Sequence, residues 1–225
     1  MRANGEETRG EKLLAASESG DAASLALLIA AGADVEAKDK DGWTAAMWAA
    51  CNGHQACLDL LIGAGAELEA KDTWWRSAVL LAASDGRDGC LRSLITAGAN
   101  LEAKDQAGRT AAMWAALYGH ETCLRELIGA GAAVEDKDGW TVVMLAAREG
   151  HEACVELLIG TGASLEAKDE EDGLTAAMWA GVNGHARLAR LIEEVQLSRS
   201  EAKQMRRETG GAPAGAKPGR RGPRV

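Results

Sequence analysis

The sequence contains no phenylalanine and one tyrosine, and its three prolines all lie at or beyond position 213. Because β-strands are rich in aromatic and β-branched residues, this composition favours helices. No apolar run reaches the roughly 18 residues that a membrane span needs, and the N-terminus lacks the apolar stretch of a signal peptide. A chain of 225 residues also buries enough core to fold without a disulfide framework. We therefore expect an intracellular, cytoplasmic, mostly helical protein.

Charge is distributed unevenly along the chain. Residues 198–225 hold eight Lys or Arg and two Glu, a net +6, so the other residues hold the remaining 17 of 25 basic and 32 of 34 acidic side chains, a net −15. An acidic body repels phosphates, which argues against nucleic-acid binding by that body. Five cysteines, an odd number, together with the lack of a signal peptide indicate a reducing compartment.

A unit of about 33 residues repeats along the sequence. The segment Thr-Ala-Ala-Met-Trp-Ala-Ala occurs at 44–50 and 110–116, and Thr-Ala-Ala-Met-Trp-Ala-Gly occurs at 175–181. A Gly-Ala pair recurs at spacings of 33, 33, 33 and 31 residues, with its glycine at Gly32, Gly65, Gly98, Gly131 and Gly162. A fixed period of this length predicts a solenoid of stacked structural units.

Each unit predicts two short helices and an extended finger. In the second unit, the Thr44 hydroxyl is placed to cap a helix over 45–51, which Gly53 ends. Apolar residues then recur at helical spacing over 55–62 and predict the second helix, which ends at a Gly-Ala-Gly sequence. The segment 67–72 follows as an extended stretch that closes in a turn.

The recurring pattern Asp-x-x-Gly-x-Thr, Ala-Ala, Gly-His, Leu-Leu and Gly-Ala resembles the ankyrin repeat family. This resemblance implies an all-α, right-handed solenoid of helix-turn-helix units, in which the finger turns and first helices line a concave face used for binding. The array is expected to lie between a flexible segment, 1–9, and a disordered basic tail rich in Gly, Pro and Arg, 197–225. We place six units, the outer two as caps, at 10–39, 40–72, 73–105, 106–136, 137–169 and 170–196.

Two departures from the family pattern affect the predicted contacts between units. The usual Thr-Pro-Leu-His is replaced by Thr-Ala-Ala-Met or Thr-Val-Val-Met, and the flexible methionines are expected to pack between units at Met47, Met113, Met144 and Met178. The asparagine that the family has in its finger is a glutamate here, at Glu36, Glu69, Glu102, Glu135 and Glu166.

Repeated cysteines and histidines suggest metal or catalytic chemistry, but their spacing argues against it. Stacked helices lie about 8–10 Å apart, whereas a disulfide needs Cα atoms within about 7 Å. Residues one unit apart are also too distant to share a metal ion, and repetition places no nucleophile beside a histidine. We therefore predict no catalytic, metal or cofactor site and interpret as packing residues Cys57, Cys90, Cys123, Cys154, His54, His120, His151 and His185.

The tryptophans of the regular units fall into two groups. Trp48, Trp114 and Trp179 form a ladder on the first helix, where packing between units is our interpretation and direct contact with a partner is the alternative. Trp43 and Trp140 lie at fingertips, where a tryptophan is expected to have little to pack on. Exposed Trp and Arg side chains often carry binding energy, about 2 kcal/mol or more at a hot spot.

The third unit breaks the pattern at its fingertip. It has Trp74-Trp75-Arg76-Ser77 where the second unit has Asp-Gly-Trp-Thr, so Trp75 stands in place of the turn glycine. A left-handed conformation at a residue other than glycine costs roughly 1–2 kcal/mol, which predicts a strained or rebuilt turn. We expect both tryptophans to be exposed and to form the centre of a partner site, with a drifted repeat as the alternative.

These observations predict a non-enzymatic, monomeric protein-interaction module that holds a protein partner on its concave face. The acidic body favours a partner with basic patches. The alternative is association with nucleic acid, or nuclear targeting, through the basic tail, and a solvated tail without a dedicated role is also consistent with its composition. The predicted partner contacts are Trp43, Trp74, Trp75, Arg76, Arg109, Tyr118, Trp140 and Arg148.

Overall fold

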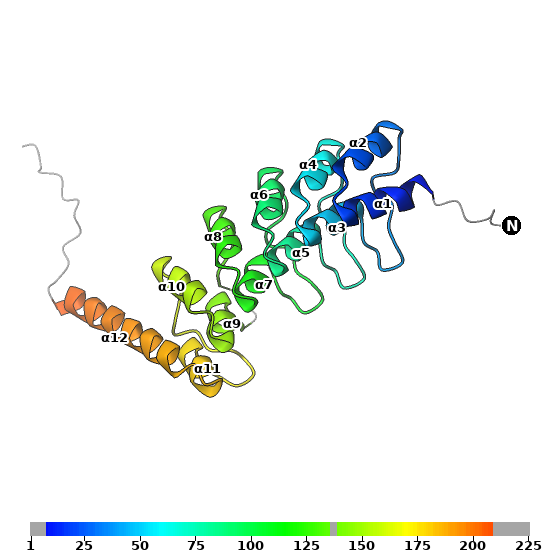
Figure 1. Cartoon of the computed structure of the whole chain (residues 1–225). Coiled ribbons are helices and arrows are strands. Elements are labelled where there is room, and N and C mark those ends of the chain that lie inside the picture. The colour runs from blue at the N-terminus through cyan, green and yellow to red at the C-terminus, as the bar shows by residue number, and fades with distance from the viewer. Residues whose placement is uncertain (1–7, 136–138, 209–225) are drawn as a thin grey trace, which may run out of the picture.

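Strong helix formers separated by glycine-containing turns produce a stack of short paired helices (Figure 1). The computed structural model describes residues 8–135 and 139–208, which contain twelve helices and no strand, only an isolated β-bridge between Lys38 and Thr44. The first helices of the pairs are α1 (Arg9–Ser19), α3 (Ala45–Asn52), α5 (Ala78–Ser84), α7 (Ala111–Leu117), α9 (Val142–Glu149) and α11 (Ala176–Val182). The second helices are α2 (Ala22–Ala30), α4 (Gln55–Gly63), α6 (Asp88–Thr96), α8 (Glu121–Gly129), α10 (Glu152–Gly160) and α12 (Ala186–Glu208).

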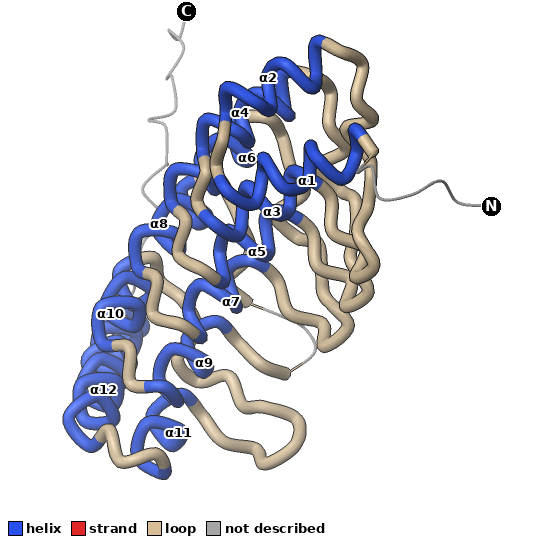
Figure 2. The backbone as a smooth tube through the Cα atoms, turned by 45° about the vertical axis from the view of Figure 1, so that its right-hand side comes forward, coloured by secondary structure: helices blue, strands red, loops and turns tan. Residues whose placement is uncertain are grey.

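The helices form two layers, and the loops between pairs project to one side as a row of fingers (Figure 2). Each first helix contacts the first helix of the next pair, and second helices from α2 to α10 do the same. The predicted all-α solenoid class is therefore confirmed. The fingers and first helices of successive units lie side by side along the stack and together form one face of the molecule (Figure 2).

A threonine caps the start of the first helices, except α5, which follows Ser77 and has no side-chain cap hydrogen bond. The Thr44 hydroxyl accepts a hydrogen bond from the backbone N–H of Met47 at 3.3 Å, and Thr110, Thr141 and Thr175 repeat this contact. α4 ends at Gly63, and Gly65 follows with a φ of 84°, a left-handed conformation that glycine adopts without steric cost. The starts and ends predicted for the second unit are thus confirmed to within a residue or two.

Small side chains and methionines build the interfaces between first helices. The alanines of α3 are buried, and Met47, Met113 and Met144 lie between neighbouring units as expected. Met178 differs: in the described part of the chain no first helix follows α11, and the Met178 side chain is 50 % exposed. The four cysteines of the second helices are buried in the same core and carry free thiols.

Each histidine of the Gly-His pairs packs on the preceding unit. His54 Nε2 lies 3.0 Å from the carbonyl oxygen of Glu18, and its ring covers Gly20, where a Cβ atom would come within 2.6 Å of Nδ1. In the third unit, Arg87 replaces the histidine and donates from Nε to the carbonyl of Cys51 at 2.9 Å. The packing role predicted for these histidines is therefore confirmed, and it holds successive units in register.

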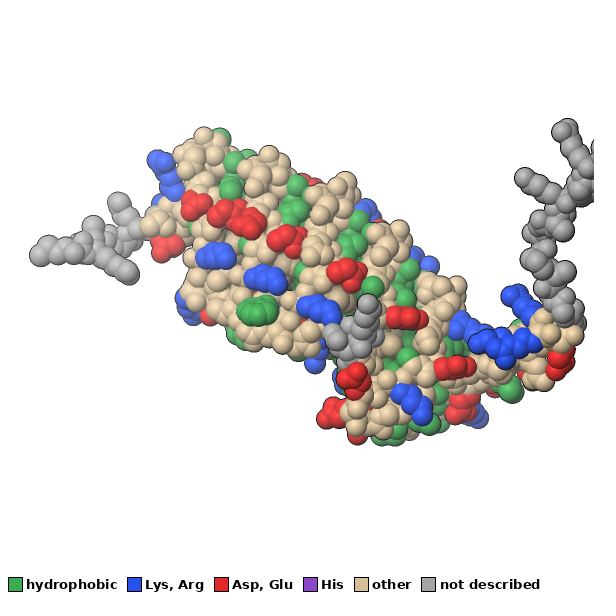
Figure 3. Space-filling model, turned by 180° about the vertical axis from the view of Figure 1, so that it is seen from behind, with side chains coloured by type: hydrophobic (Ala, Val, Ile, Leu, Met, Phe, Trp, Pro, Cys, Tyr) green, Lys and Arg blue, Asp and Glu red, His purple; other side chains and the backbone are tan. Residues whose placement is uncertain are grey.

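The finger glutamates make a second set of contacts between units. Glu69 Oε1 accepts the backbone N–H of Asn100 in the next unit at 2.8 Å, and Glu36, Glu102 and Glu135 make the equivalent bond to their following units. Seen from behind, the molecule carries a row of acidic side chains that crosses the units beside a row of basic ones (Figure 3). Part of the acidic charge of the body therefore has a structural role.

Both ends of the array differ from the boundaries expected from the sequence. Thr8 and Arg9 belong to the first helix rather than to the segment before it, because Thr8 and Glu11 form a capping box. α12 continues past residue 196 to Glu208, so 197–208 is helical and not part of a disordered tail. Arg199 holds this extension by donating to the carbonyls of Ala163 and Ile159 at 2.8 and 2.7 Å. The remaining tail, 209–225, lies outside the described residues, as do residues 1–7.

Candidate functional site

An aspartate at the end of the finger orients the fingertip residues toward the first helix. One carboxylate oxygen of Asp39 accepts the backbone N–H groups of Asp41 and Trp43, both at 2.9 Å. Asp72 and Asp105 accept from the residues two and four positions onward in the same way. These turns fix the backbone of the residue that precedes each capping position, which is Trp43, Arg76 or Arg109.

The second oxygen of the same carboxylate holds a side chain of the face. The indole N–H groups of the ladder each donate to this oxygen at 3.0 Å: Trp48 to Asp39, Trp114 to Asp105 and Trp179 to Asp169. The tryptophan ladder on the first helix is thereby locked in one orientation, with each ring half-buried. This accounts for the ladder by packing and hydrogen bonding within the units.

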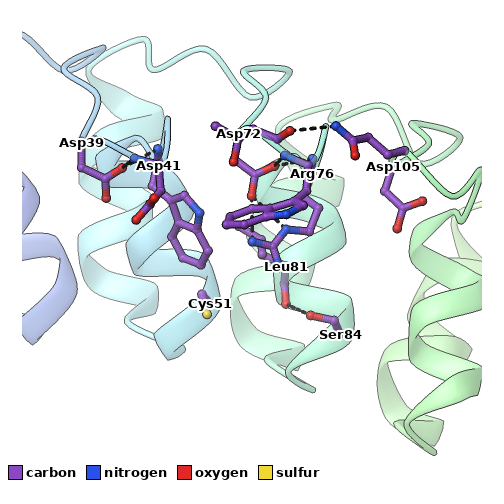
Figure 4. Close-up of polar contacts among 12 residues, drawn as sticks. Asp39, Asp41, Cys51, Asp72, Arg76, Leu81, Ser84 and Asp105 are labelled. Carbon is purple, nitrogen blue, oxygen red and sulfur yellow. Dashed lines mark hydrogen bonds and ion pairs between the residues drawn. The ribbon is translucent and has the colours of Figure 1, made fainter.

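The third unit satisfies its aspartate with a different donor. Leu81 occupies the place of the ladder tryptophan, and Arg76 turns back to Asp72, with both Nε and Nη2 at 2.8 Å from Oδ2 (Figure 4). The Asp72 side chain is fully buried and that of Arg76 is 29 % exposed. Arg76 was predicted as a partner contact, and the structure shows that its charge is already compensated within the finger.

The fingertip tryptophans Trp43 and Trp140 are less free than the sequence suggested. Both are half-buried, because each lies against a ladder tryptophan: Trp43 against Trp48 at 4.5 Å between ring centroids, and Trp140 against Trp179 at 4.9 Å. The expectation that a tryptophan there has little to pack on is wrong. The ladder supplies an aromatic surface that sequence comparison within one unit does not reveal.

Trp74 and Trp75 are exposed by 49 % and 58 %, which confirms the expectation for the third fingertip. Trp75 has a φ of 63° and is the one residue other than glycine with a positive φ among those described. The turn nevertheless keeps the regular hydrogen bond, from the Trp75 N–H to the Asp72 carbonyl at 3.0 Å, as Gly42 does to Asp39 at 3.1 Å. The turn therefore keeps its regular geometry, with a strained backbone at Trp75.

The two exposed indoles contact different cations. The Arg76 guanidinium carbon lies 4.8 Å from the Trp74 ring and 5.4 Å from the Trp43 ring, whereas Lys71 Nζ lies 5.4 Å from Trp75. Arg76 therefore links Trp74 to Trp43, the fingertip tryptophan of the preceding unit. Trp75 has its own cation on the finger.

The remaining predicted contacts form two further aromatic and cationic groups. Tyr118 is 53 % exposed and stacks on Trp114 at 5.6 Å with an interplanar angle of 13°, while Arg109 lies on Trp114 at 4.9 Å. Arg148 lies 5.1 Å from the Trp140 ring. Seven of the eight predicted residues thus belong to three groups along one face: Trp43, Trp74 and Arg76; Arg109 and Tyr118; and Trp140 and Arg148.

Two hollows lie between these groups. One is lined by Arg76, Trp114 and Tyr118 together with Asp85, which the sequence reasoning missed. Asp85 follows the end of α5 and accepts hydrogen bonds from Ser84 at 3.0 Å and from the Cys51 thiol at 3.5 Å. The other hollow lies between the fourth and fifth units, with Arg109 and Arg148 at its walls. The face therefore combines aromatic planes, fixed guanidinium groups and depressions between units.

Burial affects the thiols of the second helices and that of Cys51 on α3. Burial raises the pKa of the Cys90, Cys123 and Cys154 thiols to about 11. Burial and the neighbouring Asp85 carboxylate likewise raise the pKa of Cys51 to about 11. Because the thiolate is the reactive form, these residues favour packing over covalent chemistry. The described part of the chain holds no group of three or more His, Cys, Asp or Glu that could bind a metal ion.

Comparison with known families matches this architecture to ankyrin repeats. A family model of three ankyrin repeat copies matches residues 12–105, 57–135, 79–169 and 112–200, which together cover most of the chain. The chain belongs to the ankyrin repeat family. No curated protein sequence matches it.

Solved structures give the same result for this ankyrin repeat domain. An ankyrin repeat domain from Acinetobacter baumannii AYE is 30 % identical, with a TM-score of 0.73 over 82 % of this chain and 97 % of that one. The ankyrin repeat domain of human ASB11 is 22 % identical, with a TM-score of 0.74 over 81 % of this chain and 82 % of that one, and supports the fold alone. Ankyrin repeat domains are generally protein-interaction modules and are typically non-catalytic. Within residues 8–135 and 139–208, none of the helices has the length and apolar character to cross a membrane.

Proposed function

We propose that this ankyrin repeat domain is a non-enzymatic module that binds a protein partner on the face formed by its fingers and first helices. The observation that carries the proposal is the alignment of the three aromatic and cationic groups along that one face. Three of its aromatic side chains, Trp74, Trp75 and Tyr118, are exposed although tryptophan is usually well buried. Aromatic and arginine side chains of this kind dominate the energetics of protein interfaces.

The arrangement of these groups lowers the cost of binding. Hydrogen bonds to the finger aspartates hold Trp48, Trp114 and Arg76 in fixed orientations, so less side-chain freedom is lost when a partner is bound. We expect Trp74 and Tyr118 to act as anchors that enter apolar depressions of the partner.

The acidic body of the domain favours a partner with basic patches. Outside residues 198–225 the net charge is −15, and a row of acidic side chains lies beside a row of basic ones on the side of the molecule seen in Figure 3. Complementary charge speeds the encounter between proteins, an effect that is screened beyond a Debye length of about 8 Å at physiological ionic strength. Association should therefore become slower as salt is raised.

An affinity capture experiment tests the proposal. The wild-type domain and a Trp74→Ala/Trp75→Ala variant are compared, with Leu27→Ala as a control that removes an exposed apolar side chain from α2, outside the face. We expect a partner retained by the wild type and the control to bind the double variant at least about 30-fold more weakly, as loss of a hot spot implies. Equal affinity of the double variant and the wild type for that partner would contradict the placement of the site.

A second candidate function rests on the helical extension of α12. Lys203, Arg206 and Arg207 lie on this extension, and further arginines follow in the tail. This basic segment is the part of the chain suited to contact phosphates. A filter-binding assay with single-stranded RNA should compare the full chain with a chain ending at Glu208, because truncation at 198 would remove the Arg199 contacts to the fifth unit. Equal retention of RNA by both chains would exclude residues 209–225, and RNA retention that survives Lys203→Gln/Arg206→Gln/Arg207→Gln in the full chain would exclude the α12 extension as well.

A further inference from the structure

The hollow between the fourth and fifth units has two cationic walls and an apolar floor. Met113 and Leu145 form the floor, Trp140 forms one side, and Arg109 and Arg148 lie at the walls around a volume of about 270 Å³. Met113 and Leu145 are buried, and the two arginines are half-buried. The hollow has room for one side chain and its neighbouring backbone.

Within residues 8–135 and 139–208, the Arg109 guanidinium is not bound to its own finger aspartate, because the Trp114 indole already donates to the available oxygen of Asp105. Arg109 occupies the same position in its unit as Arg76, whose guanidinium is bound to Asp72. In the fourth unit, the Trp114 indole takes the corresponding oxygen of Asp105, and Arg109 lies on the Trp114 ring instead. Within the described residues, the Arg109 side chain makes no hydrogen bond or ion pair, whereas its backbone N–H is bound to Asp105.

Arg148 approaches the same hollow from the last turn of α9, the first helix of the fifth unit. Its guanidinium lies over Trp140 at 5.1 Å, and its Nε donates at 2.8 Å to the exposed carboxylate of Glu149. A guanidinium that stacks on an indole presents its N–H groups along its edge. Two such edges at one hollow match the two oxygens of a carboxylate.

We propose that this hollow binds the side-chain carboxylate of an aspartate or glutamate of the protein partner, while an apolar residue next to it packs on Met113 and Leu145. The inference rests on the proposed function and specifies the chemistry of one subsite. The local charge is opposite in sign to that of the acidic body, so the bound carboxylate belongs to a segment whose other charges are basic or neutral. Arg109 and Arg148 bind the carboxylate, and Met113 and Leu145 contact the apolar residue beside it.

A random 12-residue peptide library displayed on phage tests this assignment, because each displayed peptide is joined to the coat protein at its C-terminus and offers only side-chain carboxylates near the hollow. Selection on the wild-type domain is expected to enrich peptides that share an acidic residue beside an apolar one. In synthetic copies of these peptides, replacing that Glu by Gln is expected to weaken binding about ten- to a hundredfold, the usual loss for a hydrogen bond to a charged group.

Domain variants assign that loss to the two arginines. Arg109→Gln/Arg148→Gln should bind the Glu and Gln peptides with equal affinity, whereas Arg125→Gln/Arg190→Gln, which removes the same charge from α8 and α12, should discriminate as the wild type does. Arg109→Lys/Arg148→Lys keeps the charge and should recover only part of the discrimination. Circular dichroism confirms that each variant is folded.

Three outcomes would overturn the assignment. The first is that the enriched peptides share no acidic residue. The second is that Arg109→Gln/Arg148→Gln still binds the Glu peptide more tightly than the Gln peptide, by the same factor as the wild type. The third is that this variant binds every enriched peptide as tightly as the wild type does. Sensitivity to Trp74→Ala separates the two levels of inference. If the peptides lose affinity for the Trp74→Ala domain but not on replacement of their Glu by Gln, the binding face stands and the carboxylate subsite is refuted. If neither Trp74→Ala in the domain nor Glu→Gln in the peptide changes affinity, the binding face is refuted as well.

Discussion

The exchange of donors at Asp72 leads to a stability prediction that the structure defines closely. Arg76→Ala removes the cation from a carboxylate whose side chain is fully buried. Removing one partner of a buried ion pair costs about 3–5 kcal/mol. Here the arginine is partly exposed and two backbone N–H groups still bind Asp72, so we expect the free energy of unfolding to fall by about 2 kcal/mol.

A second substitution tests the reasoning rather than the contact alone. Leu81→Trp, introduced together with Arg76→Ala, should let an indole reach Asp72 as Trp48 reaches Asp39 in the second unit, and should recover at least about half of the lost stability. Both variants are measured by urea denaturation followed by circular dichroism. Arg92→Ala, which breaks only exposed pairs with Asp88 and Glu126, is the control and should cost less than about 1 kcal/mol.

Two results would refute this account. If Arg76→Ala costs no more than the Arg92→Ala control, Asp72 does not depend on the arginine. If the double variant is no more stable than Arg76→Ala, the ladder tryptophans do not owe their orientation to the finger carboxylate. Midpoints of the transitions should be compared beside their slopes, because stacked repeats can unfold in parts.

Three further predictions concern strain, titration and contact between units. Trp75→Gly should be more stable than Trp75→Ala by about 1–2 kcal/mol, because both variants lose the ring and only glycine adopts the positive φ without strain. In the same urea assay, Gly42→Ala in the neighbouring finger should lower the free energy of unfolding by a similar amount. The backbone N–H of Asp172, with further donors, lowers the pKa of Asp169. The ionised carboxylate therefore stabilises the fold above the unfolded pKa of about 4, and this stabilisation is lost as pH falls through the folded pKa. Between about pH 5 and pH 3, the temperature of unfolding should fall more steeply with pH for the wild type than for Asp169→Asn. Glu69→Ala should cost about 1 kcal/mol by leaving the next unit's N–H without its acceptor, whereas Glu69→Gln should cost less, and equal losses would exclude the hydrogen bond as the cause.

Local chemistry was sufficient to predict the helices of the regular units. The capping hydroxyl of Thr44, the alanine-rich segment after it and the glycine near 65 act within a few residues, so their effects can be read from neighbouring positions. The extension of α12 was missed because its composition after residue 196 is polar. Its anchor, Arg199, bonds carbonyls of a unit that lies about thirty-six to forty positions earlier, and no local pattern reports such a contact.

The candidate face was predicted residue by residue, but the state of each residue was not. Trp43 and Trp140 were placed correctly at fingertips, yet their burial depends on ladder tryptophans that approach them only in the folded stack. The break at Trp75 was visible because glycine recurs at that position in the other units, and the predicted left-handed backbone is present. Asp85 was missed because its position varies from unit to unit and carries no repeated signal.

The period of the repeat, the ends of its helices and the one irregular turn follow from the sequence alone, because each arises from contacts within a unit or from comparison of units. Tertiary structure decided which guanidinium is bound to its own finger aspartate. Arg76 and Arg109 occupy the same position in their units, and they differ because a tryptophan or a leucine five residues later determines whether the finger carboxylate already has a donor. That competition for one oxygen atom exists only once finger and helix lie side by side.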